Sequence, residues 1–191
     1  MIKHPIPKKT YKKPTSKSNM GMTLEADIEA TNQYYLEMNI AVIHKKPTPI
    51  QVVTVDYPAR SAAKITEAYY KTPSTTDFNG IYMGKYLDFD VKETASKTSI
   101  PLANIHPHQV KHLKNVVKHG GIAFLIVHWT YYDEHYFLPA DILFKYYDNQ
   151  KKGGRKSIPY ETFKTEAHLI PFSLNPRLDY LKIIRSLYLE K

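Results

Sequence analysis

A chain of 191 residues with 42% hydrophobic residues is long enough for one folded domain with a sizeable core. The absence of cysteine excludes disulfides and thiolate metal sites, and no apolar run reaches the length of a membrane span, so we expect a cytoplasmic protein. The 27 Lys and Arg outnumber the 18 Asp and Glu, and the resulting net charge of +9 favours a polyanionic partner such as nucleic acid. A basic surface kept for solubility is the alternative interpretation.

Residues 1–19 carry six lysines and three prolines but no acid. Such a composition buries little apolar area, which predicts a disordered basic arm that follows a phosphate backbone, or else a solvated tail without a partner. Residues 20–191 are predicted to form a single domain. Its first helix is expected over 23–37 with Thr23 as the N-cap. The apolar side of this helix would be formed by Leu24, Ile28, Tyr35 and Leu36.

A short apolar run over 40–44 predicts a buried strand. The region from about 45 to 73 then changes character, because it is basic and bounded by prolines, and it reads as an excursion from the main sheet. Within it, alternation over 50–57 predicts a strand, and the stretch 60–71 contains a helix-like Ser-Ala-Ala-Lys-Ile run.

A hairpin is predicted over 75–92, with its turn at Met83 and Gly84, where glycine eases the backbone. Residues two apart on a strand share a face. Three polar side chains of the second strand therefore project together: Asp88, Asp90 and Lys92. The intervening side chains would face the core: Leu87, Phe89 and Val91.

The remainder predicts further helices and strands around a mixed α/β core. Helices are expected over 101–118, 139–147 and 176–189, a strand buried on both faces over 122–127, and another strand over 135–138. Residues 151–156, Lys-Lys-Gly-Gly-Arg-Lys, form a basic loop that lacks the upstream glycine and strand of a phosphate-binding P-loop.

The polar residues of the central hairpin suit metal-dependent phosphodiester cleavage. Such a site needs hard oxygen ligands for Mg²⁺ and a cation beside the attacked phosphate. Asp77 lies near the start of the hairpin, across a hairpin-length gap from Asp90 and Lys92 on its second strand. An exposed charged strand is the plain alternative for this short pattern. A zinc site at the three histidines 106, 108 and 112 is disfavoured because no third suitably spaced ligand accompanies His108 and His112.

Longer segments of the sequence resemble the bacterial RecU family of Holliday-junction resolvases. They include Gly21-Met-Thr-Leu-Glu25, Ile40-Ala-Val-Ile-His-Lys-Lys-Pro-Thr-Pro49, Pro58-Ala-Arg-Ser-Ala-Ala63, Ser74-Thr-Thr-Asp-Phe-Asn-Gly-Ile-Tyr82, Asp88-Phe-Asp-Val-Lys-Glu-Thr94, His108-Gln109, Gly154-Arg-Lys-Ser157 and Pro176-Arg-Leu-Asp-Tyr180. The resemblance covers about 19–187 in order.

The resemblance implies a PD-(D/E)XK restriction-endonuclease-like fold, with a mixed central sheet flanked by helices and a projecting stalk at about 45–73. It further implies a homodimer that nicks four-way junction DNA symmetrically in recombination and repair, and that modulates the RecA recombinase. The cofactor implied is Mg²⁺, for which Mn²⁺ can substitute.

Carried over by position, the implied metal ligands are Thr75, Asp77, Asp90 and Gln109. Lys92 falls at the position that stabilises the transition state, and Glu25 is a candidate for holding a water, a surface glutamate being the alternative. The implied DNA-binding residues of the stalk are Lys45, Lys46 and Arg60. The chain departs from the family where Asp90 replaces the usual glutamate. Asp88 is expected to support the site without binding metal.

Two rival functions remain at this point. A restriction-like, sequence-specific endonuclease would use the same residues. The projecting stalk argues against it, because a stalk suited to the open centre of a junction would serve no purpose on intact duplex DNA. A non-catalytic DNA-binding regulator of recombination would not need the carboxylates and lysine, and all of these are present.

Overall fold

The protein is organised around a six-stranded mixed sheet with the strand order β1-β4-β5-β7-β8-β10. The computed structural model describes residues 20–71 and 75–190, so the predicted basic arm at 1–19 lies outside the described residues. Only β5 and β7 pair in parallel, and their neighbours pair antiparallel. The six strands are β1 (Val42–Lys45), β4 (Phe78–Tyr82), β5 (Lys85–Thr94), β7 (Ile122–Trp129), β8 (Glu134–Pro139) and β10 (His168–Ile170).

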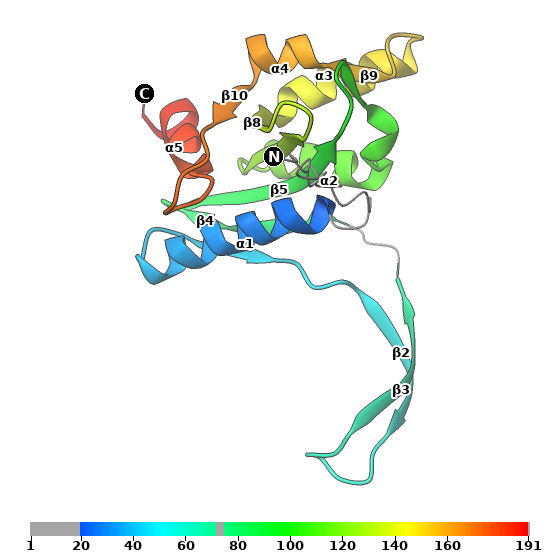
Figure 1. The fold of residues 1–191 in the computed structure, drawn as a ribbon. Coiled ribbons are helices and arrows are strands. Elements are labelled where there is room, and N and C mark those ends of the chain that lie inside the picture. The colour runs from blue at the N-terminus through cyan, green and yellow to red at the C-terminus, as the bar shows by residue number, and fades with distance from the viewer. Residues whose placement is uncertain (1–19, 72–74, 191) are drawn as a thin grey trace, which may run out of the picture.

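Helices cover both faces of this sheet (Figure 1). One face packs against α1 (Met20–Glu37) and α5 (Tyr180–Ile184), and the chain ends in a π-helical turn (Arg185–Leu189). The other face packs against α2 (Pro107–Lys118), α3 (Ala140–Lys151) and α4 (Tyr160–Glu166). Each face has its own apolar core, because successive side chains of the central strands point to opposite sides. The prediction of a mixed sheet flanked by helices is confirmed.

A long two-stranded hairpin leaves the sheet after β1 and returns before β4. Its strands are β2 (Ile50–Asp56) and β3 (Lys64–Tyr70), and Figure 1 shows them projecting well away from the rest of the molecule. Every side chain of both strands is exposed, including several aliphatic and aromatic ones. The excursion read from the prolines therefore contributes nothing to the core of this chain.

Most of the expected strands are confirmed, as is the turn at Met83 and Gly84, both of which have positive φ. The helical interpretation of the run within 60–71 is wrong. Its small residues lie in the hairpin tip, and Lys64–Tyr70 pairs with β2 instead, since a few helix-favouring residues cannot outweigh strand pairing. The buried strand at 40–44 is instead Val42–Lys45, an edge strand with only Ile43 buried.

Three expected helix boundaries also need correction. Thr23 lies inside α1 and is not its N-cap. The helix expected from residue 101 begins at Pro107, because Pro101 ends a short strand β6 (Ser99–Pro101) and a 3₁₀ turn η1 (Leu102–Asn104) follows. The helix expected from Pro176 begins at Tyr180, because the preceding segment is held by a bridge between Phe172 and Leu178.

Some elements were not expected at all. These are α4, β10 and β9 (Ser157–Pro159), which pairs with β6 in a separate two-stranded sheet. All are short, and β9 and β10 have three residues each, too few to show periodicity. No helix in the described ranges is long and apolar enough to cross a membrane.

A glycine permits the close approach of the edge strand β1 and its neighbour β4. Gly80 lies opposite Ile43, and a Cβ atom built on Gly80 would meet the Val42 carbonyl oxygen at 2.2 Å and the Ile43 Cα at 2.6 Å. Both obstructing atoms belong to backbone, so a side chain could be accommodated only by moving β1.

Substituting Gly80→Ala should therefore lower the free energy of unfolding by about 1–3 kcal/mol, the usual cost of overpacking. Urea denaturation measures this change. The neighbouring Ile81, which is 54% exposed, supplies the control, since Ile81→Ala should change stability by no more than about 0.5 kcal/mol. Equal effects of the two substitutions would contradict the role of Gly80.

Candidate active site

Two carboxylates are buried side by side along the central strand β5. Asp88 and Asp90 are fully buried, and they alternate with Leu87, Phe89 and Val91, which belong to the core beneath α1. The predicted alternation is thus confirmed, but the polar face of the strand is not open to solvent. It lies beneath α2, so each carboxylate depends on polar partners from other elements.

Asp77 meets Asp90 because of the register of the β4–β5 hairpin. Phe78 pairs with Phe89, which places Asp77 next to Asp90 across the two strands, and the Val91 N–H donates to Asp77 Oδ2 at 3.1 Å. Burial and the adjacent Asp77 carboxyl raise the pKa of Asp90 to about 8, although Lys92 acts in the opposite direction. A buried carboxyl whose pKa is raised by burial and by a neighbouring acid is typical of a functional site, where a cation can offset the charge.

Asp90 is held by one amide and one ammonium group. The Gln109 side chain, in the first turn of α2, donates from Nε2 to Asp90 Oδ1 at 2.9 Å. Lys92 Nζ forms an ion pair with Asp90 Oδ2. This oxygen nevertheless accepts no hydrogen bond of good geometry within the described residues, although it is completely buried.

The adjacent Asp77 and Asp90 carboxyls, together with an Asp90 oxygen that accepts no well-directed hydrogen bond in the described residues, fit a hard divalent cation. Mg²⁺ is bound through one or two carboxylates, with waters and substrate phosphates completing its shell. The described residues contain no group of three or more His, Cys, Asp or Glu side chains that could hold a metal. Thr75 lines the same groove as Asp77, a hollow of about 360 Å³ at the root of the hairpin.

Gln109 differs from the expectation for a ligand. Its Oε1 accepts from the His106 N–H at 3.1 Å, which caps α2, and its amide nitrogen faces Asp90. An amide nitrogen cannot coordinate a cation. In this conformation Gln109 therefore orients Asp90, and coordination would require its side chain to turn and give up the helix cap.

Asp88 anchors a separate polar network. It accepts from Lys46 Nζ at 2.9 Å, from the Tyr86 hydroxyl at 2.8 Å and from Thr76 Oγ1, and His112 Nε2 lies 2.9 Å from it. Although burial acts to raise it, the bonds from Thr76, His112 and Lys46 hold the pKa of Asp88 below its usual value. Asp88 thus joins the hairpin root, the Asp77 loop and α2, in agreement with a supporting role.

The three predicted DNA-binding residues are spread over the hairpin. Arg60 is exposed at the tip, between β2 and β3. Lys45 pairs with Glu25 at 2.8 Å and with Glu29 at 2.6 Å, while Lys46 is turned inward to Asp88. Glu25 therefore contacts a lysine, and its role toward water stays a prediction.

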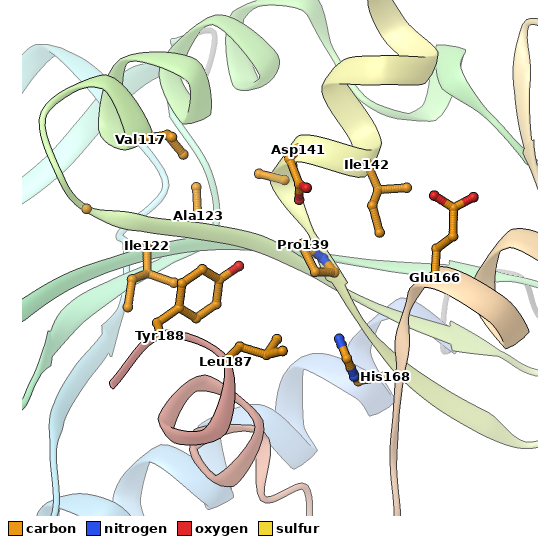
Figure 2. Close-up of a pocket in the computed structure, with 12 residues that line it drawn as sticks. Val117, Ile122, Ala123, Pro139, Asp141, Ile142, Glu166, His168, Leu187 and Tyr188 are labelled. Carbon is orange, nitrogen blue, oxygen red and sulfur yellow. The ribbon is translucent and has the colours of Figure 1, made fainter. Parts of the chain in front are cut away.

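Sequence reasoning missed the partners of Asp88. Only Tyr86 could have been found, since it lies two residues before Asp88 on the same strand face. Thr76, Lys46 and His112 come from three other segments, and nothing in their spacing connects them. The cavity in Figure 2, of about 400 Å³, is a different place, at the start of β7 and the end of β8, and contains none of the predicted site residues.

The chain that carries these two acids and the lysine is similar to known proteins over most of its length. The model of the family described as Recombination protein U, RecU, matches residues 19–186. The chain belongs to the RecU family.

Relatives within the RecU family are close. A Holliday junction resolvase RecU of Oceanobacillus iheyensis is 56% identical over 171 residues, covering 90% of this chain and 87% of that protein. The protein of the same name from Bacillus cereus is 52% identical over 182 residues, covering 95% of this chain and 91% of that protein. The structure of the Archaeoglobus fulgidus resolvase Hjc aligns more distantly, with 12% identity and a TM-score of 0.45 over 78% of this chain and 95% of that chain.

The raised pKa of Asp90 predicts a definite pH dependence of stability. The folded protein keeps a proton on Asp90 up to about pH 8, whereas the unfolded chain releases it near pH 4, so this group's contribution to stability falls as the pH rises between these values. Asp77→Asn removes the neighbouring charge and should reduce the fall, by about 1.4 kcal/mol for each pKa unit that Asp77 contributes. Thermal unfolding of the wild type and of Asp77→Asn from pH 5 to 9 tests this. Unfolding midpoints that change with pH in parallel for the two proteins would refute it.

The Asp88 network predicts a second effect on stability. Lys46→Met leaves a buried carboxylate without its cation and should cost about 1–3 kcal/mol at neutral pH. In the Asp88→Asn background the same substitution should cost clearly less, because the buried charge is gone. Urea denaturation of the two single variants and the double variant gives the coupling energy, and additive effects would show that the contact contributes nothing.

Proposed function

We propose that the protein is a divalent-metal-dependent endonuclease that resolves four-way DNA junctions. The observation that carries the proposal is the placement of Asp77, Asp90 and Lys92 at one point of the sheet by the β4–β5 register. The function named for its family relatives, Holliday junction resolvase, agrees with this chemistry. Mg²⁺ is the cation expected for a pair of carboxylates, and Mn²⁺ is expected to substitute.

Asp77 and Asp90 would hold the cation, with Thr75 as a further oxygen ligand at the edge of the groove. When bound, the cation supplies Lewis-acid polarisation of the scissile phosphate and makes the attacking water more acidic. Gln109 keeps the Asp90 carboxylate oriented through its bond to Oδ1. A fixed Asp90 carboxylate matters because preorganised groups need no rearrangement as charge develops in the transition state.

Lys92 would act on the phosphate itself. Its Nζ already lies against Asp90 Oδ2, with the side chain 18% exposed, so it is held at the site and still reaches solvent. An ammonium group there can orient the water and offset the negative charge that builds on the phosphate oxygens. This partial exposure would let Lys92 contact a substrate phosphate from its place on β5.

The projecting β2–β3 hairpin supports the choice of a branched substrate. Its exposed strands and the Arg60 tip would reach into the open centre of a junction, whereas intact duplex offers no such opening. Symmetric resolution needs two active sites, so we propose a homodimer. Modulation of the RecA recombinase is a further expectation of family membership.

Cleavage of defined DNAs tests the proposal. Purified protein should place paired nicks in a labelled four-way junction in the presence of Mg²⁺, and Asp77→Asn should abolish them. Cutting of linear duplex at a fixed sequence would favour a restriction-like enzyme instead. Junction binding without cleavage in both Mg²⁺ and Mn²⁺ would leave a non-catalytic regulator.

The role of Lys92 gives a quantitative expectation. Lys92→Ala should slow single-turnover junction cleavage by about 10²–10³-fold, the usual cost of losing one preorganised charge-stabilising group. Junction affinity in Ca²⁺ should change little, since the lost interaction strengthens only as charge develops. Lys97→Ala, at an exposed position beyond the same strand, is the matched control and should cleave at the wild-type rate. A ten-fold or smaller loss for Lys92→Ala would exclude the assigned role.

A further inference from the structure

Two basic segments lie outside the candidate active site. Helix α2 contains three lysines and no acid, and the end of α3 with the following loop, residues 147–156, contains four basic residues and one acid. These two segments lie against each other, because a groove of about 400 Å³ between α2 and α3 is lined by residues of both. The residues lining this basic groove are Pro107, Val110, Lys111, Lys114, Asn115, Tyr147 and Lys151.

The lysines occupy the outer side of α2. Gln109, Val110, Leu113 and Val116 are its buried residues, and Gln109 reaches Asp90. Lys111, Lys114 and Lys118 follow at spacings of three and four residues, which place them on one face of a helix, directed away from the sheet. The same helix therefore presents one side to the carboxylates and the other to solvent.

The charges of the basic groove are largely uncompensated. Lys114 pairs with Asp148 at 2.6 Å, and the pKa of Asp148 is lowered mainly by this hydrogen bond, with further contributions from the charges of Lys151 and Lys152. Among the described residues no carboxylate forms an ion pair with Lys111, Lys151 or Lys152. Lys151 Nζ lies 5.4 Å from the Tyr147 ring centre, so its stem is supported by an aromatic side chain.

We propose that the basic groove binds the phosphate backbone of duplex DNA, at phosphates other than the one that is cleaved. The lysines of the groove, with the amide of Asn115 and the hydroxyl of Tyr147, supply charge and donors for successive phosphates and contain no deep pocket for a base. The groove and the carboxylates lie on opposite sides of α2, so the phosphates held in the groove are different from the phosphate at the carboxylates. The proposal rests on the proposed function only in taking DNA as the ligand.

The experiment compares salt dependence of binding. Fluorescence anisotropy would measure the affinity of wild-type protein for a labelled four-way junction and a linear duplex across a range of NaCl concentrations, in Ca²⁺ and again in EDTA. The test variant is Lys111→Ala with Lys151→Ala. The control variant removes the same charge at two exposed lysines outside the groove, Lys164→Ala with Lys182→Ala.

Log K falls as log salt rises, and this fall should be less steep for the groove variant, with a slope smaller in magnitude by about 2, since each phosphate contact contributes roughly 0.9. Affinity for both DNAs should fall roughly 30-fold at 0.15 M salt on the same basis. The control should match the wild type in slope, and all three proteins should share one thermal midpoint. A Lys→Gln version of the groove variant repeats the test if the alanine version unfolds early.

A groove variant whose slope and affinity equal those of the control would overturn the proposal. An unchanged slope together with loss of binding to an acidic peptide would assign the groove to a protein partner instead, and would equally overturn it. The outcome is independent of cleavage: if the wild type fails to cut junctions, the proposed function fails while the binding slopes still decide the role of the groove.

Discussion

The burial of two carboxylates on one face of β5 is the constraint on which the rest of the structure depends. Asp88 and Asp90 are fully buried between the sheet and α2, where an ionised carboxylate without partners would cost several kcal/mol. Asp88 resolves this through four polar neighbours from separate segments. Asp90 does so less completely, because Asp77 adds a second acid and Asp90 Oδ2 has only the ion pair with Lys92 and no well-directed hydrogen bond within the described residues. One site is thus satisfied within the protein, and the other is left in need of a cation.

The contacts of Asp88 help to position Asp90 and Asp77. Through Lys46 and Thr76, Asp88 fixes the strand that leads into the hairpin and the loop that carries Asp77. Through His112 it fixes α2, whose first turn brings Gln109 to Asp90. The root of the projecting hairpin and the candidate catalytic groups therefore share one set of contacts. This gives a physical route by which DNA on the hairpin and geometry at the carboxylates can influence each other.

Helix α2 has two faces of different character. Its buried side orients Asp90, and its outer side carries the lysines of the basic groove. The large positive charge of the chain is accordingly uneven, with much of it on α2 and in the loop that follows α3. Such a concentration of positive charge raises the local concentration of a polyanion near α2.

Local pattern was sufficient to predict the parts of this site that lie on one strand or one hairpin. Alternation places Asp90 and Lys92 together, and Gly84 marks the turn that brings Asp77 opposite Asp90. Prediction failed where tertiary pairing decides: the strand Lys64–Tyr70 exists only because β2 lies beside it, and the C-terminal helix begins late because Leu178 bridges to Phe172. The ties of Lys46 and His112 to Asp88 join segments 42 and 24 residues apart, which no periodicity encodes. Likewise, the basic groove depends on how α2 and α3 pack.

The central claim is that Asp77 and Asp90, and not Asp88, hold a divalent cation. Anomalous diffraction from crystals soaked in Mn²⁺ tests it most directly. The account predicts a manganese peak between the Asp77 and Asp90 carboxylates that disappears in Asp77→Asn crystals. A peak at Asp88 and His112, or none near Asp90 at saturating Mn²⁺, would contradict it.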